Sequence, residues 1–95
     1  MDRVTRIETA LREALTPQHI EVADESAMHA GHTGAAGGGG HFRVLIVSER
    51  FHAQDLVTRQ RMVYAALDEA MKSDIHALAL RTLTPEDWAS ARGEG

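Results

Sequence analysis

The chain has 95 residues and a mass of 10.4 kDa, the size of one small domain. Ten basic and 14 acidic residues give a formal net charge of -4, so the protein as a whole lacks the charge of a non-specific nucleic-acid binder. The absence of cysteine excludes disulfides, cysteine zinc sites and thiol catalysis. No apolar run approaches the roughly 18 residues of a membrane span. We expect one cytoplasmic domain over residues 1–95 with no membrane segment.

The first expected element is an amphipathic helix. Apolar residues recur at spacings of three and four between residues 4 and 15, and Asp2 precedes them as a suitable N-cap. Thr16 should end the helix, because a residue before proline is pushed out of the helical region. Alternation at residues 20–22 then predicts a short, half-buried strand. The apolar face of the helix is Val4, Ile7, Leu11 and Leu15.

A histidine- and glycine-rich segment follows at residues 26–42, with neither helical nor strand periodicity. It holds six of the eight glycines, so we expect a loop over residues 30–40. His29, His32 and His41 could gather zinc, nickel or copper. Taken alone, the segment is more typical of a mobile loop with solvated histidines, because such a loop implies no fixed ligand geometry. His41 is interpreted as a structural residue at a strand edge.

The second half of the chain begins with a strand in HFRVLIVSERF, whose apolar residues fall on both faces and place it centrally in the sheet. A short turn is expected at residues 49–54, and a helix at about 55–71. The segment DIHALALRTL predicts a third strand. A short helix should follow Thr84, and residues 90–95 should fray. The residues expected to face the core from the helix at 55–71 are Leu56, Met62, Val63, Tyr64, Ala66, Leu67 and Met71.

These elements predict an α+β fold, a two-layer α/β sandwich in the order α-β-β-α-β-α. The second and third strands are joined by a helix, so a right-handed crossover should make them parallel. The first and second strands are joined by a loop, which allows an antiparallel pair. We therefore expect a three-stranded mixed sheet with helices on one face and a partly exposed opposite face.

Three segments resemble the BolA family: HFRVLIVSERF at 41–51, RQRMVYAAL at 59–67 and IHALALRTLTPEDW at 75–88. The preceding DESAMH is similar to the family's first loop in its histidine-bearing, BolA1-like subgroup. The resemblance extends from the first helix to Trp88 and implies a fold like the type II KH domain, with the element order above. It also implies a non-enzymatic protein, in agreement with the absence of a nucleophile or cofactor motif.

The resemblance implies partnership with a monothiol glutaredoxin, in which a 2Fe-2S cluster is shared between the proteins. Glutaredoxin and glutathione supply thiolates in the family, and the BolA protein supplies histidine. The matching positions are His76 in the third strand and His29 in the loop. The loop here is longer and richer in glycine than the family pattern, and its additional His32 is an alternative ligand. From spacing alone, His76 would be interpreted as an ordinary strand-end histidine.

The family is also linked to transcription regulation and DNA binding, which leaves a second class of function open. Arg50, Arg59 and Arg61 could form a positive surface for phosphates. A solvated helix face with ordinary ion pairs is the more typical interpretation for a chain of net negative charge. Without a partner, we expect a monomer or at most a weak homodimer.

Overall fold

A computed structural model describes residues 2–29 and 39–93. Within these ranges the chain forms helices and strands in the predicted order, with two short 3-10 helices, labelled η, between them. The elements are α1 (Arg3–Leu15), β1 (His19–Asp24), η1 (Ser26–His29), β2 (Gly40–Val47), η3 (Glu49–Phe51), α2 (Leu56–Ala66), α3 (Asp68–Ser73), β3 (Ile75–Leu83) and α4 (Pro85–Ala91).

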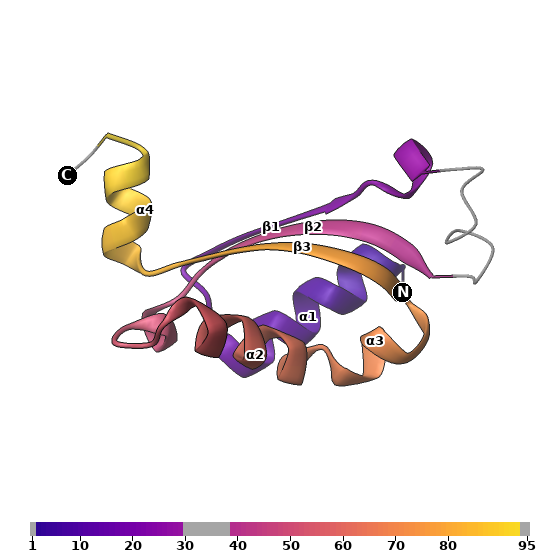
Figure 1. The fold of residues 1–95 in the computed structure, drawn as a ribbon, viewed down its shortest axis with the longest axis horizontal. Coiled ribbons are helices and arrows are strands. Elements are labelled where there is room, and N and C mark those ends of the chain that lie inside the picture. The colour runs from indigo at the N-terminus through magenta and orange to yellow at the C-terminus, as the bar shows by residue number, and fades with distance from the viewer. Residues whose placement is uncertain (1, 30–38, 94–95) are drawn as a thin grey trace.

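The three strands form one mixed sheet with β2 in the centre. Strand β1 pairs antiparallel with β2, and β3 pairs parallel with it, as predicted. Helices α1, α2 and α3 cover one face of the sheet (Figure 1). Helix α4 instead lies on the opposite side, at one end, where the Trp88 ring stacks on His19 with ring centres 4.8 Å apart. The predicted α+β architecture with a mixed sheet is confirmed, but the expectation that all helices share one face is wrong for α4. The helices of the described residues leave most of the second face uncovered.

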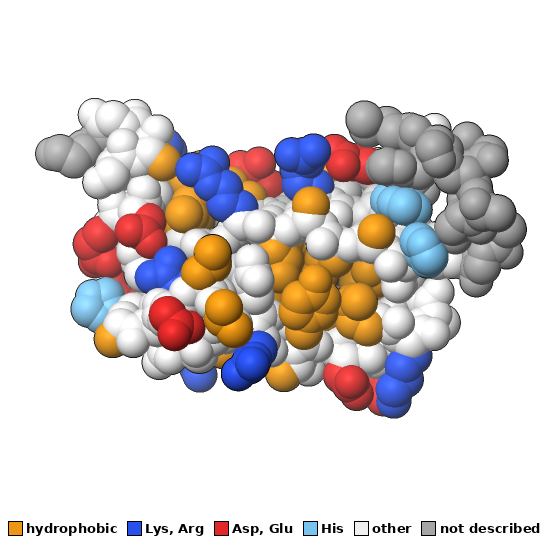
Figure 2. Space-filling model, viewed as in Figure 1, with side chains coloured by type: hydrophobic (Ala, Val, Ile, Leu, Met, Phe, Trp, Pro, Cys, Tyr) orange, Lys and Arg blue, Asp and Glu red, His pale blue; other side chains and the backbone are white. Residues whose placement is uncertain are grey.

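The hydrophobic core lies between the sheet and helices α1 to α3. Alternate residues of β2 point into it, which explains the strongly apolar centre of that strand. The buried members are Ile7, Leu11, Leu15, Phe42, Val44, Ile46, Phe51, Val63, Leu67 and Ile75. Figure 2 shows further apolar side chains gathered where β3 runs beside α2 and α3. No helix within the described residues is long and apolar enough to cross a membrane.

Helix α1 begins and ends at the predicted residues. The Asp2 carboxylate accepts a hydrogen bond from the Thr5 N–H at 2.7 Å, and this bond lowers the pKa of Asp2 below its ordinary value. At the other end, Thr16 adopts φ 44° and ψ 57°, a left-handed conformation that stops the helix before Pro17. The N-cap at Asp2 and the proline at residue 17 therefore mark the start and the end of α1 as predicted.

The helix expected at 55–71 is two helices. Leu67, with φ -99° and ψ 15°, separates α2 from α3 and is itself buried. No glycine or proline marks the break, so the sequence contains no local signal for it. The expectation that Leu56 and Tyr64 face the core is wrong, because their exposures are 60% and 41%. Leu56 lies in the first turn of α2, and the core receives Phe51 from the preceding η3 turn instead.

Candidate functional site

His76 is the second residue of β3, and its side chain is exposed. The pairing of β2 with β3 has a register shift here: Gly40 is opposite Ile75, whereas His41 is opposite Ala77. His76 is therefore an extra residue in β3 with no partner in the ladder, as in a β-bulge, which redirects a side chain and is common next to functional sites. The imidazole therefore lies exposed at the start of an edge strand of the sheet.

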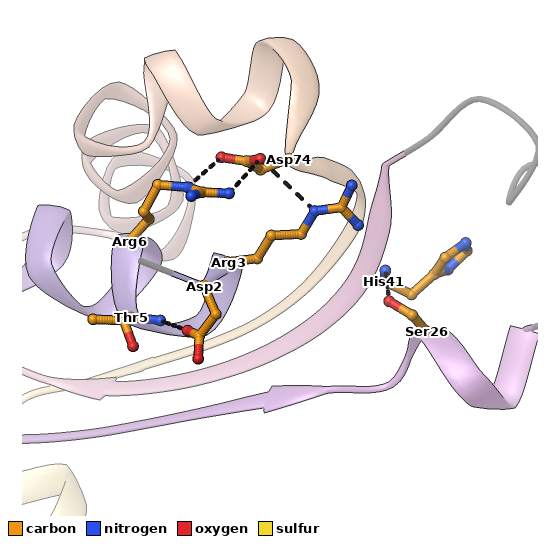
Figure 3. A network of polar contacts seen from close by, with 7 residues as sticks. All are labelled: Asp2, Arg3, Thr5, Arg6, Ser26, His41 and Asp74. Carbon is orange, nitrogen blue, oxygen red and sulfur yellow. Dashed lines mark hydrogen bonds and ion pairs between the residues drawn. The ribbon is translucent and has the colours of Figure 1, made fainter.

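A second histidine lies beside it. The rings of His41 and His76 have centres 5.2 Å apart and are tilted by 49°. His41 is the second residue of β2, so it lies near the end of a strand, as the sequence predicted. Its Nε2 atom is buried. Its backbone N–H donates to Ser26 Oγ at 3.1 Å (Figure 3), and its carbonyl accepts from the Glu25 N–H at 2.7 Å. The main chain of His41 is thus fixed on both sides.

An ion-pair cluster holds the start of β3 in place. The Arg6 guanidinium donates two hydrogen bonds of 3.0 Å to the Asp74 carboxylate, and Arg3 lies 3.7 Å from the same group (Figure 3). The Asp74 carbonyl also accepts from the Gly40 N–H at 2.9 Å. Helix α1 and the first residue of β2 are therefore both bonded to Asp74, which lies two residues before His76. Sequence reasoning missed this cluster, because Arg6 and Asp74 are 68 residues apart.

The last two glycines of the run are required by close packing. A β-carbon on Gly39 would lie 2.8 Å from the His76 nitrogen and 3.2 Å from its Cα. On Gly40 it would lie 2.7 Å from both the Phe42 ring and Ser26 Oγ. These distances are shorter than ordinary van der Waals contacts, so any side chain here would displace the main chain of His76 or the buried Phe42 ring. Part of the glycine run therefore serves the histidine site.

The predicted loop ligands are only partly visible. His29 ends η1, where only its backbone is described, and His32 lies outside the described residues. Helix η1 begins at Ser26, whose N–H donates to the Asp24 carboxylate at 2.9 Å; hydrogen bonds from Ser26 lower the pKa of Asp24. Ser26 also contacts His41, so η1 is attached to the start of β2. Within residues 2–29 and 39–93, no three or more His, Cys, Asp or Glu side chains gather as metal ligands.

The three arginines of the alternative surface have different environments. Arg50 in η3 and Arg61 in α2 are exposed. The Arg59 guanidinium instead donates to the Gln54 carbonyl at 2.9 Å, the Thr82 carbonyl at 3.3 Å and the Asp87 carboxylate at 3.1 Å. It therefore links α2 to β3 and α4. Contact of Arg59 with a phosphate would compete with these bonds, whereas Arg50 and Arg61 present their charges to solvent.

Acidification should loosen α4, because Asp87 acts there as a carboxylate. Hydrogen bonds from the Thr84 N–H and from Arg59 hold the pKa of Asp87 below its ordinary 3.8. A carboxylate with a lowered pKa stabilises the fold above 3.8, and this contribution disappears as the pH falls through the lowered value. We expect the Trp88 fluorescence of α4 to change in this acid range. The variant Asp87→Asn should show a smaller acid transition; an unchanged transition would contradict the assignment.

The fold and the site define a class: a small α+β domain with an open sheet face and an exposed histidine at the bulged start of its last strand. The family model described as "BolA-like protein" matches residues 11–87. The chain therefore belongs to the BolA family. The predicted family and fold are both confirmed.

Individual relatives agree with this assignment. The chain is 43% identical over 83 residues to "DNA-binding transcriptional regulator BolA" of Escherichia coli (strain K12), covering 87% of this chain and 76% of that protein. It is 43% identical over 82 residues to human "BolA-like protein 1", covering 86% of this chain and 58% of the relative. The crystal structure of a Bol-like protein from Babesia bovis superposes with a TM-score of 0.79 at 34% identity, covering 97% of this chain and 95% of that one.

Proposed function

We propose that this chain is a non-enzymatic partner of a monothiol glutaredoxin, with which it shares or transfers a 2Fe-2S cluster in iron–sulfur assembly or iron homeostasis. The observation that carries the proposal is His76, an exposed imidazole on a bulged strand start whose backbone is fixed by neighbouring contacts. Family membership supports it. Since the chain has no cysteine, glutaredoxin and glutathione would supply the thiolates.

The chemistry of the donor fits this cargo. Imidazole replaces thiolate on one iron of Rieske clusters and raises the potential relative to all-thiolate ligation. The exposure of His76 suits a ligand that must reach a cluster already held by another protein. A second histidine would come from the loop, with His29 as the first candidate and His32 as its competitor. Since histidine ligates as the neutral base, cluster sharing should weaken on acidification.

Anaerobic mixing with a cluster-loaded monothiol glutaredoxin tests the proposal. The natural chain should form a one-to-one complex with a changed visible circular dichroism spectrum, and His76→Ala should lose both. The matched control is His52→Ala, because His52 is an exposed histidine after η3, which follows the other end of β2. His29→Ala and His32→Ala then identify the loop ligand. An unaltered cluster spectrum with His76→Ala, in a chain that remains folded by far-ultraviolet circular dichroism, would exclude histidine ligation at this position.

DNA-binding regulation is the second candidate function, favoured by the name of the Escherichia coli relative. The structure directs its test to Arg50 and Arg61, since the side chain of Arg59 is already bonded within the fold. Replacing Arg50 and Arg61 together with glutamate should weaken DNA binding and reduce its salt dependence. A salt-titrated binding assay measures both quantities. His76→Ala should leave them unchanged, so the two candidate functions are separable.

A further inference from the structure

The spacing of the His41 and His76 rings suits a metal ion held between them. A histidine nitrogen lies about 2.0–2.1 Å from a bound zinc ion, which places the ring centre about 3.2 Å from the metal. Two such rings at the tetrahedral angle of about 109° have centres about 5.2 Å apart. The measured separation of the ring centres is 5.2 Å. The distance between the two ring centres therefore already matches that of two imidazoles on a tetrahedral ion such as Zn²⁺.

We propose that His41 and His76 form a two-histidine site that binds a divalent ion, Zn²⁺, Ni²⁺ or Cu²⁺, in the chain alone, without glutaredoxin. Two imidazoles are donors of borderline softness, which these ions prefer over Mg²⁺ and Ca²⁺. The site differs from cluster sharing in its ion, in its second ligand and in needing no thiolate from a partner.

Fixed backbones on both strands support the chelate. The main chain of His41 is bonded to Ser26 and Glu25, and Gly39 packs directly against the main chain of His76. The carbonyl of Asp74 and the N–H of Gly40 join the two strand starts at 2.9 Å. A site gains affinity when its ligands are already held near their bound positions, because less conformational entropy is lost on binding.

Nearby carboxylates are already engaged with arginine. Glu25 lines the same surface hollow as His41 and Ala77, but its carboxylate accepts from Arg43 Nε at 3.0 Å. The Asp74 carboxylate is held by Arg6 and Arg3. Among residues 2–29 and 39–93, we therefore expect the two imidazoles to provide the protein ligands, and water or a ligand from solution to occupy the remaining positions. Such an open site should bind more weakly than a three- or four-ligand site.

Because His76 would be a ligand of both the divalent ion and the 2Fe-2S cluster, the two should compete for its imidazole. Bound Zn²⁺ is expected to inhibit complex formation with cluster-loaded glutaredoxin in the natural chain. This consequence depends on the proposed function, but the metal site itself does not. Metal binding is therefore measured first without glutaredoxin, so that failure of one proposal is distinguishable from failure of the other.

The test is titration of the isolated chain with ZnCl₂ and CuCl₂, followed by calorimetry and by electron paramagnetic resonance for Cu²⁺. A variant with His29→Ala and His32→Ala serves as the background, so that loop histidines do not contribute. In this background we expect one bound ion per chain. Adding His41→Ala or His76→Ala should weaken binding at least tenfold, and adding His52→Ala should leave it unchanged.

A second measurement uses the natural chain and avoids any folding defect of the variants. Substoichiometric Cu²⁺ should broaden the amide signals of His41 and His76 before those of His19 and His52. The proposal is overturned if the background variant binds neither ion, if His41→Ala binds as tightly as the background, or if broadening is strongest at His19 or His52.

Discussion

Replacing Phe51 with alanine is expected to lower the free energy of unfolding by about 3–5 kcal/mol, as for other large aromatic residues in cores. Phe51 comes from the three-residue η3 turn and is fully buried in the core cluster. Small domains unfold with a total of only about 5–15 kcal/mol. The variant should therefore be close to unfolded at 37 °C, and urea-induced unfolding followed by far-ultraviolet circular dichroism measures the loss.

Leu56→Ala provides the matched control, because Leu56 is also apolar and begins the next helix but is 60% exposed. Truncation of an exposed side chain leaves no cavity, so we expect a change within about 0.5 kcal/mol. Phe51→Leu should give an intermediate loss, because it removes part of the buried volume. Equal losses for Phe51→Ala and Leu56→Ala would contradict the observed burial at this end of the core.

The contrast between these two residues shows where sequence periodicity is informative. In α1, Ile7, Leu11 and Leu15 are all buried, because the helix lies against the sheet along the predicted face. In the α2–α3 segment the same periodicity continues from Leu56 to Met71, although the helix breaks at Leu67. Hydrophobic periodicity indicates which residues share one face of an ideal helix. It does not indicate how far along the helix the core extends, because tertiary packing determines the extent of the core.

The site shows a similar division. The resemblance of IHALAL to the family identified His76, and periodicity placed it in the third strand. The adjoining contacts were not predictable, because they join distant parts of the chain. Asp74 meets Arg6 across 68 residues, and the His41–His76 contact depends on a register shift between parallel strands. Neither the register shift nor the partner of an arginine leaves a local pattern in the sequence.

The glycine run combines both kinds of information. Its composition predicted a loop, and it contains the loop histidines of the family resemblance. The structure adds that Gly39 and Gly40 lie where an added β-carbon would approach His76, Phe42 and Ser26 at 2.7–2.8 Å. For these two glycines, the constraint is space beside the site, since neither has a positive φ. The end of the run is therefore expected to matter to the function of His76.

Replacing Gly39 with alanine should impair His76 while leaving the fold largely intact. The added β-carbon would lie 2.8 Å from the His76 nitrogen and 3.0 Å from its Cβ. Because one of these atoms belongs to the backbone, rotation of a side chain cannot relieve the contact, and the start of β3 must shift. Overpacking of this kind typically costs about 1–3 kcal/mol. We expect at least tenfold weaker Cu²⁺ binding and a reduced glutaredoxin-induced change in the cluster spectrum.

Gly93→Ala is the matched control, since no atom lies within 4 Å of its added β-carbon. Its φ of 76° makes alanine strained there, so this variant can be destabilised at the end of α4 without any contact near His76. Comparison of the two variants separates general destabilisation from displacement of the site. Backbone chemical shifts of His41 and His76 should change in Gly39→Ala only. If both variants bind Cu²⁺ and glutaredoxin as the natural chain does, close packing of Gly39 is not what positions His76.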